Sequence, residues 1–354
     1  MNNSKRLLRL ATGPVVAVAA AFAIGAILIA IAGVDPLVAY QALFLGAFGN
    51  KTALAETLIK AAPLTLAGLG IMFAFRTNTF NMGAEGQLYF GALATTVVAL
   101  AFPGLPRVFL VPVLILAAAL GGGLWAAIPA YLKATRGSSE IILTIMLNYV
   151  AVLFVGFLLQ GPLQAPGTNT PVSPFIPANA QAPIIWGGTR LHASILLAVL
   201  VAIGAYVLLW HTPIGLKLRA VGDTPGTAKA VGIPVTRMVV LSMAISGALA
   251  GLAGMGEITG VHGRLLSGFS PGYGNTAIAV ALVGKLNPVG VVLSGIFFAA
   301  LRTGADTMQR WVAVPASLSY VLQGMVVLFV LAGEFMRDTT GLAARIKGAF
   351  GLGK

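Results

Sequence analysis

The sequence predicts an all-α fold: a polytopic membrane protein of about ten transmembrane helices in two inverted five-helix halves, with some helices short or broken. The first observation is composition, because 58% of the 354 residues are hydrophobic and 9% are charged, whereas soluble domains carry about 25% charged residues. The second is a series of apolar runs of about 20 residues, the length that spans a bilayer. The third is a pair of Gly-rich interruptions at matching places in the two halves of the chain.

Composition also excludes several classes of protein. The mean hydropathy is +0.94, and this much apolar surface cannot be hidden inside one soluble core of this size. A water-soluble enzyme, a disordered chain and a secreted disulfide scaffold are therefore excluded. Because the sequence has no cysteine, it has no thiolate metal site and no cysteine nucleophile.

Ten segments are apolar enough to be membrane spans. The first follows three basic residues but is longer than the roughly 7–15 apolar residues of a signal peptide, so we interpret it as an uncleaved helix. The longest loops are 160–190, outside, and 211–237, inside, and the chain forms a single transmembrane domain with halves at about 1–160 and 190–336. The expected spans are 14–34, 58–75, 88–102, 108–132, 141–159, 191–210, 238–256, 276–283, 288–301 and 312–336.

The net charge of +13 has two possible explanations. Basic residues could form a nucleic-acid-binding patch, or they could collect in the cytoplasmic loops of a membrane protein. Here they are scattered between apolar runs and are not interleaved with aromatics, which favours the second explanation and predicts no nucleic-acid partner. With ten spans and both termini in the cytoplasm, 15 Lys and Arg residues fall inside and 7 outside, which supports this orientation.

Two Gly-rich interruptions precede unusually short spans. Residues 80–86 (FNMGAEG) and 269–274 (FSPGYG) both contain Phe-x-x-Gly and lie about 190 residues apart. Interrupted spans at corresponding positions of inverted repeats are the best sequence pointer to a transport site. The alternative is that both interruptions are ordinary connecting turns.

Polar residues near the interruptions are the candidates for solute contact. Glu85 could face a cavity together with Asn81 and Gln87, or it could cap a helix N-terminus. Asn148 could line the path or bond a neighbouring helix. The residues expected along a solute path are Phe80, Asn81, Gly83, Glu85, Gln87, Asn148, Phe269, Tyr273 and Asn275.

Other motifs indicate structure and not chemistry. The sequence has no P-loop, and its three histidines lie far apart with no HExxH motif, so no metal site is expected. The stretch 268–272 (GFSPG) matches the nucleophile motif of serine hydrolases but lacks the strand that this motif requires. Gly247 and Gly251 form a G-x-x-x-G pair that favours close helix packing.

The inner loop contains a short capped helix. Thr224 can serve as N-cap, Pro225 occupies the first helical position, and Gly232 suits the position after the helix. A helix over 225–231 spans about 10 Å and is too short to be stable alone, so it must dock on something else. It is what a membrane subunit needs to receive force from a soluble motor; the alternative is a solvated loop.

Four stretches resemble one known family. They are 56–88, which ends in FNMGAEGQL, 140–151 (EIILTIMLNYVA), 218–233 (LRAVGDTPGTAKAVGI) and 272–292 (GYGNTAIAVALVGKLNPVGVV). Together they resemble the permease subunits of bacterial ABC importers for nucleosides and simple sugars, in the branched-chain amino acid/ribose-like permease family. The resemblance covers most of the chain and is greatest to the longer permease of nucleoside systems.

The resemblance implies partners and roles. It implies a second permease subunit, an external solute-binding protein, and ABC ATPase subunits that hold ATP and magnesium, with no cofactor in this chain. Thr224 and Thr227 stand where the family usually has Asn and Ala, and Thr224 can still cap. The resemblance also implies that the inner loop contacts the ATPase, through Gly222, Asp223, Thr224, Pro225, Ala228, Lys229, Gly232 and Ile233.

Two functions are compatible with these observations. The first is the permease subunit, not itself an enzyme, of an ATP-driven importer in the bacterial inner membrane that moves a nucleoside, or otherwise a simple sugar. The second is a stand-alone secondary transporter or channel for a small polar solute. A secondary transporter needs buried carboxylates for its coupling ion, and the few available, Glu85 and Glu257, argue against it.

Overall fold

The computed structural model describes residues 3–315, 317–318, 320–330 and 332, with side chains from Val16 onward except at residue 17. The end of the last expected span and the basic residues counted near the C-terminus lie outside this description, as do the side chains of the basic residues near the N-terminus. Contacts divide the chain into two compact units: unit 1, residues 1–49 with 301–354, and unit 2, residues 50–300.

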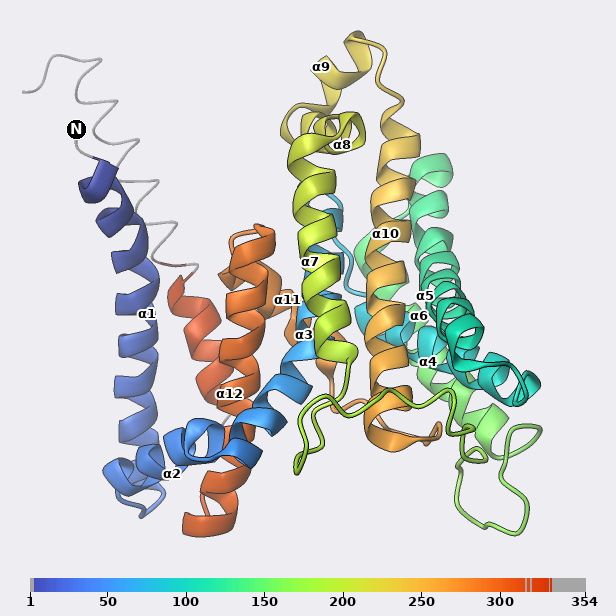
Figure 1. Cartoon of the computed structure of the whole chain (residues 1–354). Helices are drawn as coiled ribbons and strands as arrows, with labels where there is room; N and C mark the ends of the chain where they lie inside the picture. The colour runs from blue at the N-terminus through green and yellow to red at the C-terminus, as the bar shows by residue number, and fades with distance from the viewer. Residues whose placement is uncertain (1–2, 316, 319, 331, 333–354) are drawn as a thin grey trace, which may run out of the picture. The chain divides into compact units, whose positions relative to one another are not determined.

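The regular secondary structure of the described residues is helical, which confirms the all-α class (Figure 1). Two isolated β-bridges accompany the helices. The helices are α1 (Asn3–Ile31), α2 (Pro36–Phe48), α3 (Lys51–Arg76), α4 (Ala84–Ala101), α5 (Arg107–Arg136), α6 (Glu140–Leu159), α7 (Ser194–His211), α8 (Pro213–Asp223), α9 (Pro225–Ala230), α10 (Val235–Gly256), the π-helix η1 (Glu257–His262), α11 (Tyr273–Val283), α12 (Pro288–Val312) and an apolar helix at Tyr320–Val330.

Unit 2 is built around α3 and α10. Every residue of α3 from Ala61 to Ala74 is buried, as expected for a helix that is apolar all round. α10 packs against α3, α4 and α5. A side chain at Gly251 would overlap the carbonyl of Ala118 on α5, so the predicted close approach at the G-x-x-x-G pair is confirmed.

Unit 1 contains a sharp break that the sequence analysis missed. The segments Val18–Ile31 and Pro36–Phe48 meet at 119°. The Asp35 side chain accepts a hydrogen bond of 2.8 Å from the Leu37 amide, and Pro36 occupies the first helical position of α2, a strong helix start.

The number of spans stays a prediction. Six described helices are long and apolar enough to cross a membrane, and a seventh results if the bent pair counts as one span. Each of the ten expected spans overlaps a helix, but α11 and Tyr320–Val330 are short. The chain is therefore a polytopic membrane protein. Helix length alone does not fix the number of its spans at ten.

One expected boundary is wrong. α12 continues past Leu301 to Val312, so Arg302 and Arg310 lie in this helix and not in an outer loop. Arg302 is buried, and its Nη2 donates to the Tyr320 hydroxyl at 3.4 Å. A polar stretch resembles a loop in the sequence, but paired polar side chains are tolerated on the protected face of a span.

The segment 160–193 before α7, which contains the expected outer loop 160–190, is ordered by packing on the bundle. The Ser173 amide donates to the Leu265 carbonyl, and the Ile176 amide donates to the Gly263 carbonyl, both at 2.8 Å. Figure 1 shows this segment at one end of unit 2 and α9 at the opposite end.

Candidate functional site

The structure places the first interruption at residues 77–83, between α3 and α4, three residues earlier than expected, and it is held against α10. The hydroxyls of Thr77 and Ser242 lie 2.7 Å apart, and the Asn81 amide donates to the Ser246 hydroxyl at 2.8 Å. Ser242 and Ser246 are four residues apart and share one face of α10. The sequence analysis did not identify these two serines, although their spacing on an apolar helix was the available signal.

Asn81 and Gln87 form a closed amide pair. Each side chain donates to the other at 2.9 Å, and the Gly83 amide donates to the Asn81 oxygen at 2.9 Å. Both amides are buried. A side chain at Gly83 would press on Gln87 and Thr144, at 2.9 and 3.0 Å. These three predicted residues therefore hold the interruption in place.

Glu85 joins the two interruptions. It is 8% exposed, and its carboxylate accepts a hydrogen bond of 2.7 Å from the Gly274 amide, in the first turn of α11. A side chain at Gly274 would overlap the backbone of Glu85. Both interpretations of Glu85 have support, because its carboxylate caps the first turn of α11 and its side chain also lines a cleft.

Asn148 also binds the first interruption. Its amide nitrogen donates to the Met82 carbonyl, and its oxygen accepts from the Gly86 amide, both at 2.8 Å. A mid-span asparagine on α6 thus satisfies backbone groups that the broken helix leaves open.

A cleft of about 410 Å³ lies where these elements meet. Three predicted residues line it, namely Glu85, Asn148 and Asn275. Asn275 is exposed, and Tyr149, which the sequence analysis missed, is 65% exposed. Ile145, Tyr149 and Val152 share one face of α6. The full lining is Met82, Glu85, Ile145, Asn148, Tyr149, Val152, Asn275 and Ile278.

The three predicted aromatic residues lie outside the cleft lining. Phe80 is 41% exposed and its ring packs edge-on against Phe75, with centroids 5.2 Å apart. Phe269 and Tyr273 are buried, and the Phe269 ring lies 4.7 Å from that of Tyr89.

Ser270 supports the start of α11. Its hydroxyl accepts hydrogen bonds of 3.3 Å from the amides of Gly272 and Tyr273. Within the described part of the chain no strand precedes it. The strand–turn–helix context of a hydrolase nucleophile is therefore missing there.

At the other end of unit 2, the expected short helix is present as α9. It ends one residue earlier than expected, at Ala230. Gly232 has φ of +81°, its amide donates to Lys229, and the Ile233 amide donates to Ala228. This pair of bonds is a Schellman motif, which confirms the expected role of Gly232.

The Thr224 cap is observed in part. Thr224 occupies the N-cap position and its carbonyl accepts from the Ala228 amide at 3.0 Å. Among the described residues, however, its side chain makes no capping hydrogen bond, because its ψ of 84° departs from the usual N-cap conformation.

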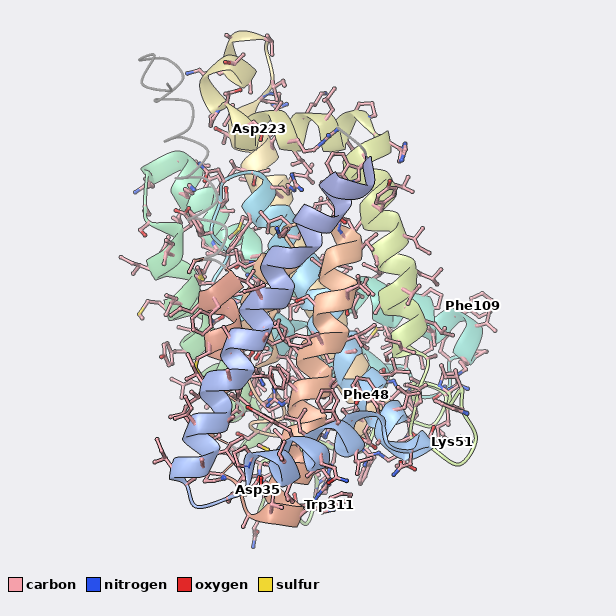
Figure 2. All side chains as sticks on the ribbon, turned by 90° about the vertical axis from the view of Figure 1, so that its left-hand side faces the viewer. Asp35, Phe48, Lys51, Phe109, Asp223 and Trp311 are labelled. Atoms are coloured by element: carbon pink, nitrogen blue, oxygen red, sulfur yellow. The ribbon has the colours of Figure 1, made fainter. Side chains whose placement is uncertain are left out.

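α9 presents most of its surface to solvent. Ala228 is buried, whereas Pro225 and Lys229 are exposed, as is Asp223, which Figure 2 shows at the opposite end of unit 2 from Lys51. The preceding helix α8 was expected as loop. Its N-cap Thr212 accepts from the Gly215 amide at 3.1 Å, and Pro213 follows the cap.

Known proteins resemble the chain over most of its length. The glucose ABC transporter permease protein TsgB13 of Haloferax volcanii is 37% identical, covering 92% of this chain and 88% of the relative. The guanosine ABC transporter permease protein NupP of Bacillus subtilis is 35% identical, covering 93% and 95%. The nucleoside ABC transporter permease protein NupB of Lactococcus lactis is 30% identical, covering 93% and 92%.

A family assignment follows from these matches. Residues 53–331 match the family described as the permease component of the branched-chain amino acid transport system. Permeases are transport components and not enzymes, and such a family implies an ATPase and a solute-binding protein as partners in general. The chain belongs to this permease family and is the permease subunit of an ABC importer.

Proposed function

We propose that α9 is the docking element for the ATPase and that the cleft between α6 and α11 lies on the solute path. The observation that carries this proposal is α9 itself. A six-residue helix has no stability alone, yet this one is closed by a Schellman motif and exposed at the end of unit 2. Binding and hydrolysis of ATP, with its magnesium, take place in the partner.

The polar groups of the cleft fit a neutral solute with an aromatic ring. The Tyr149 ring can stack on a flat base, because stacked aromatic pairs are favourable. The Asn275 amide can both donate and accept a hydrogen bond. We therefore infer that the solute is a nucleoside, in agreement with the names of two of the relatives. A simple sugar is the second candidate, since another relative is named for glucose.

Further partners complete the proposed assembly. A second permease subunit encloses the cleft, which is open on one side of this chain. The solute-binding protein docks at the end that carries the segment 160–193. The termini and α9 face the cytoplasm and the membrane is the bacterial inner membrane, as the distribution of basic residues favours.

Reconstitution tests this proposal. Proteoliposomes that contain the chain with its ATPase, the second permease and the binding protein are loaded with ATP and given labelled guanosine. We expect accumulation that requires ATP and is not reduced by excess glucose. Accumulation of glucose in place of guanosine would overturn the nucleoside assignment.

The secondary-transporter alternative is decided by the same preparation. Vesicles that contain the chain alone are given an ion gradient and labelled guanosine. The proposal expects no uphill uptake there. Concentration of guanosine by the chain alone would show that it needs no ATPase.

A further inference from the structure

Arg76, the last residue of α3, joins three elements of unit 2. Its Nε and Nη2 donate to the Leu286 carbonyl at 3.0 and 2.8 Å. Its guanidinium lies 5.5 Å from the centre of the Trp210 ring, at the end of α7, and the Arg219 guanidinium lies 4.4 Å from the same ring. A planar fork that also stacks is a combination that arginine alone provides.

The carbonyl that Arg76 holds belongs to a strained turn. Lys285 and Leu286, between α11 and α12, have φ of 54° and 50°, a conformation that residues other than glycine seldom adopt. Such conformations persist where surrounding contacts fix them, and they cluster at active sites, ligand clamps and switch regions. Arg76 is one of the contacts that fix this turn.

α8 presses directly on the same place. A side chain at Gly222, in the last turn of α8, would overlap the carbonyl oxygen of Arg76. The backbones of α8 and α3 therefore touch at this point. Asp223 and Arg219 are the charged groups of α8 that act on the Arg76 guanidinium.

These contacts lie between α9 and the cleft. α9 follows Gly222 after two residues, and the first interruption follows Arg76 directly. The turn at Leu286 ends α11, whose first turn is bonded to Glu85. A rigid displacement of α8 thus acts on both interruptions through one junction, defined as Gly222, Arg76 and the Leu286 carbonyl.

We propose that this junction transmits the movement of α9 to the two broken segments. Arg76 is the positioning residue, and the backbone at Gly222 is the part of α8 that contacts it. The inference rests on the proposed docking of the ATPase at α9. It adds the internal route from the docking element to the cleft.

Two variants test the junction in the reconstituted transporter. Gly222→Ala places a methyl group against the Arg76 carbonyl, and Arg76→Lys keeps the charge but loses the fork. We expect each to retain the ATPase on purification and to hydrolyse ATP, while uptake per ATP falls about tenfold or more, within the range of typical coupling free energies. Gly204→Ala is the matched control, because Gly204 is helical, exposed and has no neighbour within 4 Å.

A positional readout separates transmission from mere stability. The chain has no cysteine, so Ile145→Cys, at an exposed lining residue with no proposed solute contact, gives a single labelling site in the cleft for an environment-sensitive fluorophore. ATP binding should change its emission in the otherwise unaltered chain and leave it unchanged with Arg76→Lys. If the Gly222→Ala chain does not insert into the membrane, the test relies on the Arg76→Lys variant alone.

Different results would contradict the proposed function and the proposed junction. If the unaltered assembly neither binds the ATPase nor transports, the proposed function is wrong. If it transports and both junction variants match its uptake per ATP and its fluorescence change, the junction is not the route.

Discussion

Two asparagines near the cleft have the same side chain and different roles. Asn81 is buried and exchanges hydrogen bonds with Gln87, Ser246 and the Gly83 amide. Asn275 is exposed on the cleft wall. Burial thus divides the predicted polar residues into those that hold the interruption and those that are free to meet a solute.

Paired substitutions test this division. Asn81→Ala leaves buried partners unsatisfied, which costs on the order of 1–3 kcal/mol of unfolding free energy. Asn275→Ala removes an exposed amide, so stability should change by less than about 0.5 kcal/mol while guanosine uptake falls. Unfolding midpoints in detergent and initial uptake rates are the measurements. An Asn81→Ala protein with an unchanged midpoint would contradict the assignment.

We expect His192 to make the stability of unit 2 depend on pH. It precedes α7, and burial, with a further contribution from Arg190, lowers its pKa from the ordinary 6.5 to about 4. Among the described residues neither ring nitrogen has a hydrogen-bond partner, and the ring packs on Gly260 of η1. The unfolded chain takes up a proton near pH 6.5, whereas the folded chain resists it down to about pH 4.

Acidification should therefore destabilise the protein between these values. The loss is fully developed below the lower value and amounts to about 3 kcal/mol. His192→Phe keeps a ring against Gly260 and removes the titration. Between pH 7 and pH 5 the unfolding midpoint of the original protein should fall further than that of His192→Phe, and equal falls would exclude His192 as the cause.

At the scale of elements, the sequence predicts the long helices and both interruptions but misses α2 and α8. Apolar length identifies spans, and these helices of 13 and 11 residues are too short for that criterion. Their signal was local: Asp35 and Thr212 each precede a proline, an N-cap followed by a first helical residue.

Part of the candidate site could not be predicted for a different reason. The motif of the first interruption was sufficient to predict Glu85 as a site residue. Asn148 and Asn275 were predicted because they are polar residues in or near apolar segments. Tyr149 faces the cleft because of the rotation of α6 about its axis. A helix that is apolar on every side contains no signal for that rotation.

The termination of α9 gives a prediction at this scale. Gly232→Ala forces a side chain into a left-handed conformation that costs about 1–2 kcal/mol and opens the Schellman motif. We expect the chain to insert but uptake per ATP hydrolysed to fall. Gly137→Ala is the control, because Gly137 has φ of +67° and open space but ends α5. Equal losses in the two variants would mean that α9 has no special role.

At the scale of the whole molecule, the two ends of unit 2 should lie on opposite sides of the membrane. Asn169 and Thr227 are exposed at these ends. Because the chain has no cysteine, a cysteine placed at either position is the single site for labelling. A membrane-impermeant maleimide should label Asn169→Cys in intact spheroplasts and Thr227→Cys in inverted vesicles. The reverse pattern would invert the proposed orientation.

The bond between Glu85 and the Gly274 amide also bears on leakage. An ABC permease must pass its cargo without discharging the cell's sodium and proton gradients. The Glu85 carboxylate is 8% exposed and accepts the Gly274 amide, while Asn275 and Tyr149, the exposed polar side chains beside it, are uncharged. The exposed polar side chains of the proposed passage therefore suit uncharged cargo, and the carboxylate in its lining also fastens one broken helix to the other.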